Sequence, residues 1–210
     1  MFLEALRPQQ LALLNELSDL KIITDKFYLA GGTALALKLG HRESNDFDFF
    51  CENVFNAKDY INIIERNYNG IVTSSTEDTV VGIIKDVSIS FFLYPYKLLD
   101  SFDNYKNVRL ASLNDLACMK FKALSQRGLK RDFYDIYEIL KIIQPIELKF
   151  LMLNKYKSNG SSFYHLARCL VYFNDAEEDK NPISLNGTTW EMVKTYLIKN
   201  QTKILKAFIE

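Results

Sequence analysis

Two aspartates separated by one residue, Asp46 and Asp48, could together hold a metal ion. They lie in a segment that alternates polar and apolar side chains, which predicts a strand with Phe47 and Phe49 facing the core and both aspartates on the opposite face. Their Cα atoms would be about 6.6 Å apart, close enough for both carboxylates to bind one divalent cation. Such a cation neutralises phosphate charge in phosphoryl transfer. An ordinary solvated strand end has the same pattern, so the pair alone does not establish a metal site.

A pair of glycines, Gly31 and Gly32, comes before the aspartates in the sequence. The short apolar run 27–30 leads into the glycines and predicts a strand, and Thr33 is placed to cap a following helix. Backbone N–H groups in such a turn can approach a phosphate, with the positive end of the helix behind them. A plain tight turn has the same sequence. The order of strand, glycine pair, helix and aspartate strand places the glycines and the aspartates beside each other at one end of a sheet.

Basic and acidic residues gather in the second half of the chain. Lys120 and Arg127 are seven residues apart and share a helix face if the helix continues, while Asp132 and Asp135 are neighbours at i and i+3. Further basic residues in the same stretch are Lys122, Lys130 and Arg131. A triphosphate is a plausible ligand for this cluster, because arginine offers bidentate contacts and lysine a point charge. The alternative is an exposed helix face with ion pairs such as Arg131 with Asp135.

The composition is that of a globular protein with a substantial core, since 48% of its 210 residues are hydrophobic. Its 26 Lys and Arg balance 26 Asp and Glu, so the net charge gives no sign of a strongly basic nucleic-acid-binding field. The three cysteines are far apart and form no CxxC motif, which favours reduced thiols over disulfides or a zinc site. No stretch approaches the roughly 18 apolar residues of a membrane span. We therefore expect a cytoplasmic protein with no membrane partner.

The order of elements predicts an α/β (α+β) fold with a mixed sheet flanked by helices, followed by a C-terminal helical region. Strands are expected at 27–30, 46–50, 71–73, 80–84, 87–94 and 108–110, and helices at 8–17, 33–39, 58–67, 113–126, 132–143, 146–157, 161–173 and 188–208. Residues 85–86 could form a tight turn, and the acidic stretch 175–182 is typical of a surface loop. We expect an α/β core at residues 1–111 and a helical region at 112–210 that completes the site and packs on the core.

Several stretches together resemble the motifs of a known family. They are YLAGGTALAL (28–37), GHRES (40–44), DFDFF (46–50), DLACMKFKA (115–123), RG (127–128) and KRDFYDIY (130–137). In this order they resemble the AbiEii/AbiGii-type nucleotidyltransferase toxins of type IV toxin–antitoxin and abortive-infection systems. The resemblance covers about residues 25 to 143, and it implies the nucleotidyltransferase fold.

The resemblance also implies an activity, which is transfer of a nucleotide from a nucleoside triphosphate with Mg²⁺ (or Mn²⁺) as cofactor. In characterised members the acceptor is the end of tRNA, and the toxin is usually encoded beside an antitoxin. Carried over to this chain, Gly31, Gly32 and Thr33 would hold phosphate, and Asp46 and Asp48 would bind the metal. Lys120 and Arg127 would meet the triphosphate, with Lys130 and Arg131 in the same basic cluster, and Asp132 and Asp135 would lie near the acceptor.

One position departs from the usual pattern of nucleotidyltransferase folds, which present a third carboxylate from a neighbouring strand. The matching strand of this chain offers Ser88 or Ser90 there, with Asp86 before them. A hydroxyl cannot replace a carboxylate as metal ligand or base at neutral pH. Either Asp86 or Asp135 substitutes, two carboxylates suffice, or catalysis is impaired. A catalytically silent nucleotide-binding or protein-interaction module, and an antitoxin-like enzyme that modifies a partner protein, therefore stay open as alternatives.

Overall fold

The computed structural model describes residues 1–157 and 160–209 of the chain. Its internal contacts divide the chain into two compact units. We call Met1–Lys97 with Ser101–Ser112 the sheet unit, and Leu98–Asp100 with the chain from Leu113 onward the helical unit. No helix among the described residues is long and apolar enough to cross a membrane.

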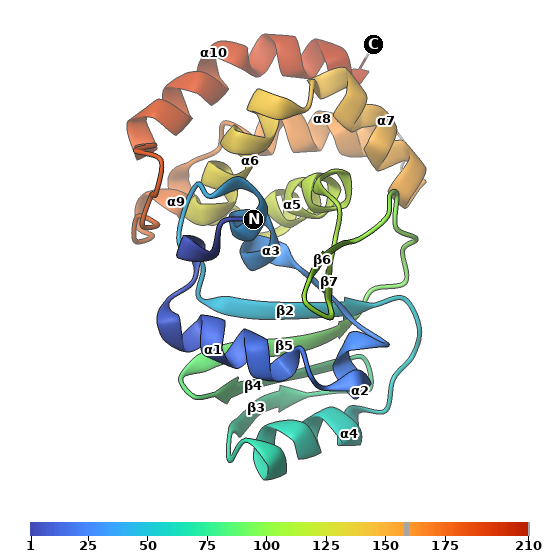
Figure 1. The fold of residues 1–210 in the computed structure, drawn as a ribbon. Helices are drawn as coiled ribbons and strands as arrows, with labels where there is room; N and C mark the ends of the chain where they lie inside the picture. Colours follow the sequence, from blue (N-terminus) through green and yellow to red (C-terminus); the bar gives the residue numbers. More distant parts are fainter. Residues whose placement is uncertain (158–159, 210) are drawn as a thin grey trace. The chain divides into compact units, whose positions relative to one another are not determined.

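The sheet unit contains the mixed sheet that the sequence predicts, and this sheet has seven strands. The strands are β1 (Tyr28–Ala30), β2 (Asp46–Cys51), β3 (Ile71–Ser75), β4 (Thr79–Ile84), β5 (Val87–Leu93), β6 (Asp103–Tyr105) and β7 (Val108–Leu110). Their order in the sheet is β3-β4-β5-β2-β1-β7-β6, and the first four lie side by side in Figure 1. β2 is parallel to β5 and antiparallel to β1, so the aspartate strand lies between both neighbours in the middle of the sheet. β6 is not among the strands expected from the sequence.

Helices of the sheet unit cover a core rich in aromatic side chains. They are η1 (Leu3–Ala5), α1 (Pro8–Leu17), α2 (Lys21–Thr24), α3 (Gly31–Leu39) and α4 (Ala57–Asn62), which continues as the π-helical turn η2 (Ile63–Asn67). Phe47 and Phe49 of β2 are fully buried, and Phe49 stacks on Phe91 of β5 with ring centroids 5.5 Å apart. The alternation in β2 therefore works as predicted, because burying these two rings turns the aspartates toward the other face of the sheet.

The turn between β4 and β5 is the tight two-residue turn that the sequence predicts. Lys85 and Asp86 both have positive φ, at 49° and 61°. Such a turn matches the right-handed twist of the two strands that it joins. It fixes the register of β5, and through β5 it fixes which β5 residues lie beside the aspartates of β2.

The helical unit consists of helices packed on one another. They are α5 (Leu113–Arg127), α6 (Lys130–Ile142), α7 (Pro145–Tyr156), α8 (Gly160–Cys169), α9 (Asn174–Glu177) and α10 (Trp190–Ile209). α5 contacts α6, α7 and α8, and the long α10 packs along α6, α7 and α8 (Figure 1). A fully buried ion pair joins α5 to α7, where Lys155 Nζ lies 2.6 Å from Asp115 Oδ1. The Asp115 carboxylate also accepts the backbone N–H of Leu99, which ties Leu98–Asp100 to this unit.

Two predictions for the helical unit need correction. The helix predicted at 161–173 ends at Cys169, and the acidic stretch predicted as a plain surface loop begins inside the short helix α9. Ala176 in that helix is fully buried, and the Glu177 carboxylate accepts a hydrogen bond from the Trp190 indole at 2.9 Å. The acidic stretch is therefore packed in place by specific contacts that its polar composition does not reveal.

Candidate active site

The two aspartates lie on one face of the sheet, near its centre. Both keep part of their surface accessible, whereas Phe47 between them is fully buried. The register places Asp48 beside Ala30 of β1 on one side and beside Ser90 of β5 on the other. Because β1 leads directly into the glycine pair, the predicted neighbourhood of glycines and aspartates is present in the structure.

Gly31 is a glycine for two physical reasons. Its φ is +66°, in the left-handed region that side chains with a Cβ rarely adopt. A Cβ at this position would also lie 2.6 Å from Oδ2 of Asp48. The missing side chain therefore lets the Asp48 carboxylate come directly against the turn at the start of α3.

Gly32 makes room for a residue that the sequence analysis did not assign to the site. A Cβ on Gly32 would lie 2.6 Å from Nη2 of Arg42, which is only 3% exposed. Arg42 Nη1 donates to the carbonyl of Glu43 at 2.9 Å. A buried guanidinium thus lies against the glycine turn and adds positive charge next to the first turn of α3, where the helix dipole already favours an anion.

Thr33 has a different structural role from the predicted one. The helix begins at Gly31 with Ala30 as its N-cap, so Thr33 is inside the first turn and caps nothing. Its side chain is 1% exposed, contacts the Ser44 hydroxyl at 2.8 Å and donates to the carbonyl of Asp46. Thr33 therefore fastens the start of the aspartate strand to the glycine turn. Gly40 ends α3 in the left-handed conformation, as predicted.

The strand beside β2 has hydroxyl side chains at the positions where nucleotidyltransferase folds usually present a third carboxylate. Ser88 pairs with Asp46 and Ser90 with Asp48 in the parallel ladder, while Asp86 is exposed in the β4–β5 turn. Among the described residues, no group of three or more His, Cys, Asp or Glu side chains is placed to hold a metal ion. Two carboxylates still fit Mg²⁺, because this ion is usually bound by one or two protein carboxylates together with substrate phosphates.

The helical unit brings together four of the predicted site residues in one ion cluster, formed by Lys120, Arg127, Asp132 and Asp135. Lys120 Nζ lies 3.1 Å from Asp132 Oδ1 and 2.6 Å from Asp135 Oδ2. Arg127 makes two contacts with Asp132, Nε to Oδ2 at 3.0 Å and Nη2 to Oδ1 at 3.2 Å. Both aspartates are fully buried and Lys120 nearly so, whereas the Arg127 side chain is 48% exposed.

The charges in this cluster compensate one another. Burial by itself raises the pKa of Asp132, but Lys120 and Arg127 outweigh burial and hold that pKa below its ordinary value. Asp132 is therefore a carboxylate at neutral pH, and its two cations are oriented by it. A preoriented lysine and arginine can stabilise charge that develops in a transition state without having to reorganise first.

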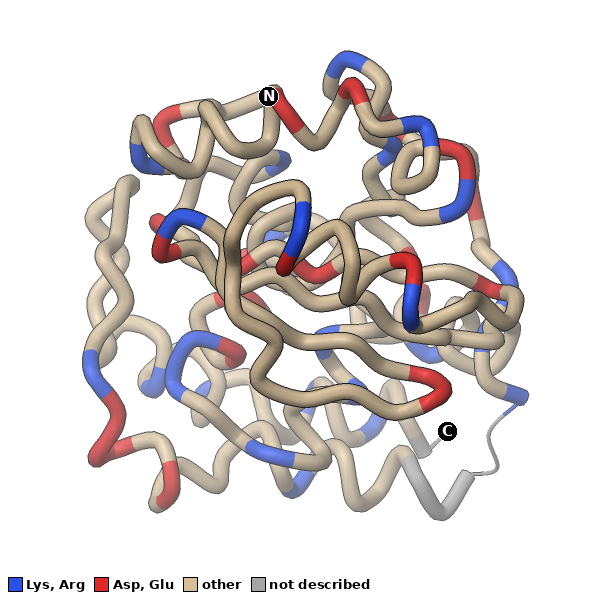
Figure 2. The backbone as a smooth tube through the Cα atoms, turned by 90° about the horizontal axis from the view of Figure 1, so that it is seen from below, with Lys and Arg blue, Asp and Glu red and all other residues tan. Residues whose placement is uncertain are grey.

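The two remaining basic residues have different surroundings. Lys130 is 5% exposed, and its ammonium donates to the backbone carbonyls of Glu177 and Asp179 at 3.2 and 2.6 Å. Arg131 is exposed on the first turn of α6. Along the described part of the backbone, basic and acidic positions are interspersed (Figure 2), as expected from equal numbers of each in the sequence.

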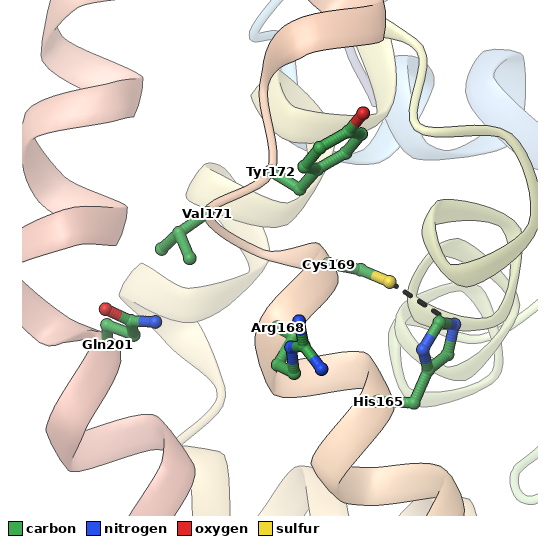
Figure 3. A pocket seen from close by; sticks show the side chains of 6 residues that line it. All are labelled: His165, Arg168, Cys169, Val171, Tyr172 and Gln201. Carbon is green, nitrogen blue, oxygen red and sulfur yellow. Dashed lines mark hydrogen bonds between the residues drawn. The ribbon is translucent and has the colours of Figure 1, made fainter.

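A separate pocket in the helical unit contains none of the predicted site residues. It has a volume of about 520 Å³ and is lined by His165, Arg168, Cys169, Val171, Tyr172 and Gln201 (Figure 3). Cys169 Sγ lies 3.4 Å from His165 Nε2. Burial nevertheless raises the pKa of the Cys169 thiol, so the pair lacks the thiolate of an activated nucleophile.

Comparisons with solved structures agree with this architecture. A Helicobacter pylori protein inferred to be a nucleotidyltransferase superposes with a TM-score of 0.55, at 19% identity, over 94% of this chain and 96% of that chain. The antibiotic-resistance factor ANT(2'')-Ia superposes with a TM-score of 0.56, at 13% identity, over 74% of this chain and 95% of its own. At these identities the likeness shows the fold, which is that of the nucleotidyltransferases.

Sequence comparisons extend the relationship to a family. An uncharacterised protein of Aquifex aeolicus is 36% identical over 180 residues, which cover 83% of this chain and 86% of that protein. The profile described as "Nucleotidyl transferase AbiEii toxin, Type IV TA system" matches residues 13–96 and 89–194. The matched residues include the glycine turn, the aspartate strand and the ion cluster, and the chain belongs to the AbiEii family of nucleotidyltransferase toxins.

Proposed function

We propose that this protein transfers a nucleotide from a nucleoside triphosphate to the acceptor end of tRNA, and that a cognate antitoxin protein opposes it in the cell. The proposal rests on one observation, which is that the Asp48 carboxylate lies directly against the glycine turn. The absent Cβ of Gly31 leaves space for the Asp48 carboxylate, and Asp46 projects from the same strand face. A carboxylate pair next to helix N–H groups suits a ligand that carries both a divalent cation and phosphates.

In this proposal Asp46 and Asp48 hold Mg²⁺ or Mn²⁺, and the turn Gly31-Gly32-Thr33 supports the phosphates. When bound, the metal neutralises negative charge on the triphosphate. The backbone N–H groups at the start of α3 hydrogen-bond phosphate oxygens, and Arg42 behind Gly32 adds positive charge to that end of the helix.

We assign the contacts with the rest of the triphosphate and with the acceptor to the ion cluster of the helical unit. We assign contacts with the triphosphate to Lys120 and Arg127, because both cations are oriented by Asp132 and the exposed half of Arg127 is accessible to a ligand. Asp132 and Asp135 are assigned to the acceptor. The acceptor hydroxyl gives its proton to one of these two carboxylates as its oxygen attacks the α-phosphorus, the bond from that phosphorus to the bridging oxygen breaks, and pyrophosphate leaves with the electron pair of that bond.

A second candidate function is supported by one specific observation. Ser90 is in register with Asp48, at the position from which a third carboxylate would reach the metal. If two carboxylates bind Mg²⁺ and triphosphate but cannot activate the acceptor, the protein is a nucleotide-binding module without turnover. The two functions differ in one measurable property, which is the appearance of product.

The test is incubation of the purified chain with MgCl₂, total bacterial tRNA and each of the four labelled nucleoside triphosphates in turn. The control is the variant Asp46→Ala/Asp48→Ala, and we expect label in RNA only with the wild type and with its preferred nucleotide. Binding of Mg²⁺ and triphosphate without labelled RNA or labelled protein would favour the silent module. Label on a protein in a cell lysate, and not on RNA, would instead indicate an enzyme with a protein acceptor.

A further inference from the structure

We propose that Gln10 is a positioning residue of the nucleotide site, which sets the place of Asp46 and of Arg42. Together with Phe2 and Ala5 of the N-terminal segment, it does this by holding the loop 40–45, which joins α3 to the aspartate strand. This inference rests on the proposed function, because the geometry that it concerns is that of the metal-binding pair.

The backbone of Ser44 is held by the N-terminal segment at both of its polar groups. Its N–H donates to the carbonyl of Ala5 at 3.1 Å, and its carbonyl accepts from the Gln10 amide nitrogen at 2.8 Å. Gln10 is 4% exposed and Ser44 is 7% exposed. Ser44 is two residues before Asp46, so these bonds fix the chain immediately before the first metal ligand.

The orientation of the Gln10 amide is determined by its other end. Gln10 Oε1 accepts the backbone N–H of Arg7 at 2.9 Å, in the first turn of α1. An amide whose oxygen accepts there must present its NH₂ group to the opposite side, and that side is the Ser44 carbonyl. A glutamine is therefore matched to this position, because one side chain satisfies an N–H and a carbonyl at once.

A path of hydrogen bonds continues from Ser44 to the metal-binding strand. The Ser44 hydroxyl contacts the Thr33 hydroxyl at 2.8 Å, and Thr33 donates to the carbonyl of Asp46. Arg42, in the same loop, lies with Nη2 against Gly32. The loop thus delivers both the carboxylate strand and the guanidinium to the glycine turn, and Gln10 holds the loop.

The other end of the loop is held by the same segment. Phe2 N donates to the carbonyl of Leu37 at 2.8 Å, and the Phe2 ring occupies the space into which a Cβ of Gly40 would project. The family profile begins at residue 13, so no role for Gln10 follows from the family. The assignment rests on the contacts of this chain alone.

The test is a titration of the 210-residue chain with MnCl₂, monitored by electron paramagnetic resonance, which measures free Mn²⁺ directly and needs no turnover. We expect Gln10→Leu to weaken Mn²⁺ binding about tenfold, the lower end of what loss of an outer-shell partner costs. Two control variants on the same helix distinguish a loss of positioning by Gln10 from a general loss of stability. Gln9→Leu removes a neighbouring amide that donates to the Lys85 carbonyl instead, and Leu13→Ala destabilises the fully buried core of α1.

Retained Mn²⁺ affinity in both controls, together with the loss in Gln10→Leu, supports the positioning role. Unchanged affinity in Gln10→Leu overturns it, and so does an equal loss in Leu13→Ala, since the effect would then be general destabilisation. If the wild type binds no more Mn²⁺ than Asp46→Ala/Asp48→Ala does, the proposed metal site itself fails, and this inference fails with it.

Discussion

The acidic residues of the two units occupy opposite environments. Asp46 and Asp48 lie on a sheet face with part of their surface accessible, and their surroundings are shaped by backbone, through a glycine turn and strand pairing. Asp132 and Asp135 are fully buried, and cationic nitrogens of Lys120 or Arg127 lie within 3.1 Å of them. The sheet pair is arranged so that a ligand can reach it, whereas the helical cluster is assembled by the fold itself.

Because of this difference, removing a charge should have different consequences in the two regions. In the proposed site, removing a carboxylate from the sheet pair takes away a contact with the ligand and also removes one of two like charges that lie close together, so we expect the fold to stay intact. Removing a charge from the helical cluster leaves a buried ion without its partner, which is costly in itself. We therefore expect substitutions of Asp46 and Asp48 to lower activity with little change in stability, and substitutions in the helical cluster to lower stability in addition to any effect on activity.

The largest expected effect is on transfer by Asp48→Asn. A metal ion contributes several kcal/mol of charge stabilisation in such reactions, so transfer should fall by about three orders of magnitude. The urea midpoint of unfolding should stay close to that of the wild type, because the asparagine has the same shape and the strand pairing is unchanged. Single-turnover transfer and equilibrium unfolding measure the two quantities. A large loss of stability would remove the contrast between the two regions.

Lys120→Met tests the expected structural role of the ion cluster in the helical unit. It leaves Asp132 and Asp135 buried without their shared ammonium, and breaking a buried ion pair in this way costs about 3–5 kcal/mol. Urea unfolding measures the change. Lys199→Met, at an exposed position of α10, is the matched control, expected to stay within about 0.5 kcal/mol of the wild type. Equal effects of the two substitutions would contradict a structural role for the cluster.

Gly31→Ala should lower the free energy of unfolding by less than Lys120→Met does. A left-handed conformation costs a residue with a Cβ about 1–2 kcal/mol, and the new Cβ meets Asp48 Oδ2. Gly187→Ala measures the cost of the left-handed conformation alone, because Gly187 has φ +78° and an added Cβ there would have nothing within 4 Å. Thermal unfolding of both variants should therefore show the larger loss for Gly31→Ala. Equal losses would mean that Asp48 moves aside without cost.

The sequence was sufficient for those parts of the site that depend on local pattern. Alternation with a period of two predicts β2 and the face of its aspartates, because one strand face must be buried. Helical spacing predicts that Asp132 and Asp135 are neighbours on one helix face, and in the structure both contact Lys120. These predictions concern residues within one element or in two consecutive elements, where chain geometry limits the alternatives.

The rest depends on contacts between distant segments. Gln10 and Ser44 are 34 residues apart, and nothing in either neighbourhood indicates their hydrogen bond. Thr33 has the residue type of a helix cap, but its hydroxyl instead bonds the Asp46 carbonyl across the loop. Arg42 lies in the GHRES stretch of the sequence, but its position against the glycine turn is evident only from the structure, in the space that Gly32 leaves. A charged residue in a loop is ordinarily exposed, so its burial is decided by tertiary packing.

The smallest expected effect concerns the acid dependence of stability. Burial raises the pKa of Asp132, but Lys120 and Arg127 hold it below its ordinary value, which is about 3.9 in unfolded chains. The Asp132 carboxylate therefore contributes stability above that pH, and the contribution is lost as the pH falls through the lower, folded pKa. We expect Asp132→Asn to be less stable than the wild type at pH 7, and its free energy of unfolding should fall less steeply below about pH 5. Urea titrations at pH 3, 4, 5 and 7 measure both slopes, and parallel curves would show that the cluster does not depress this pKa in the folded state.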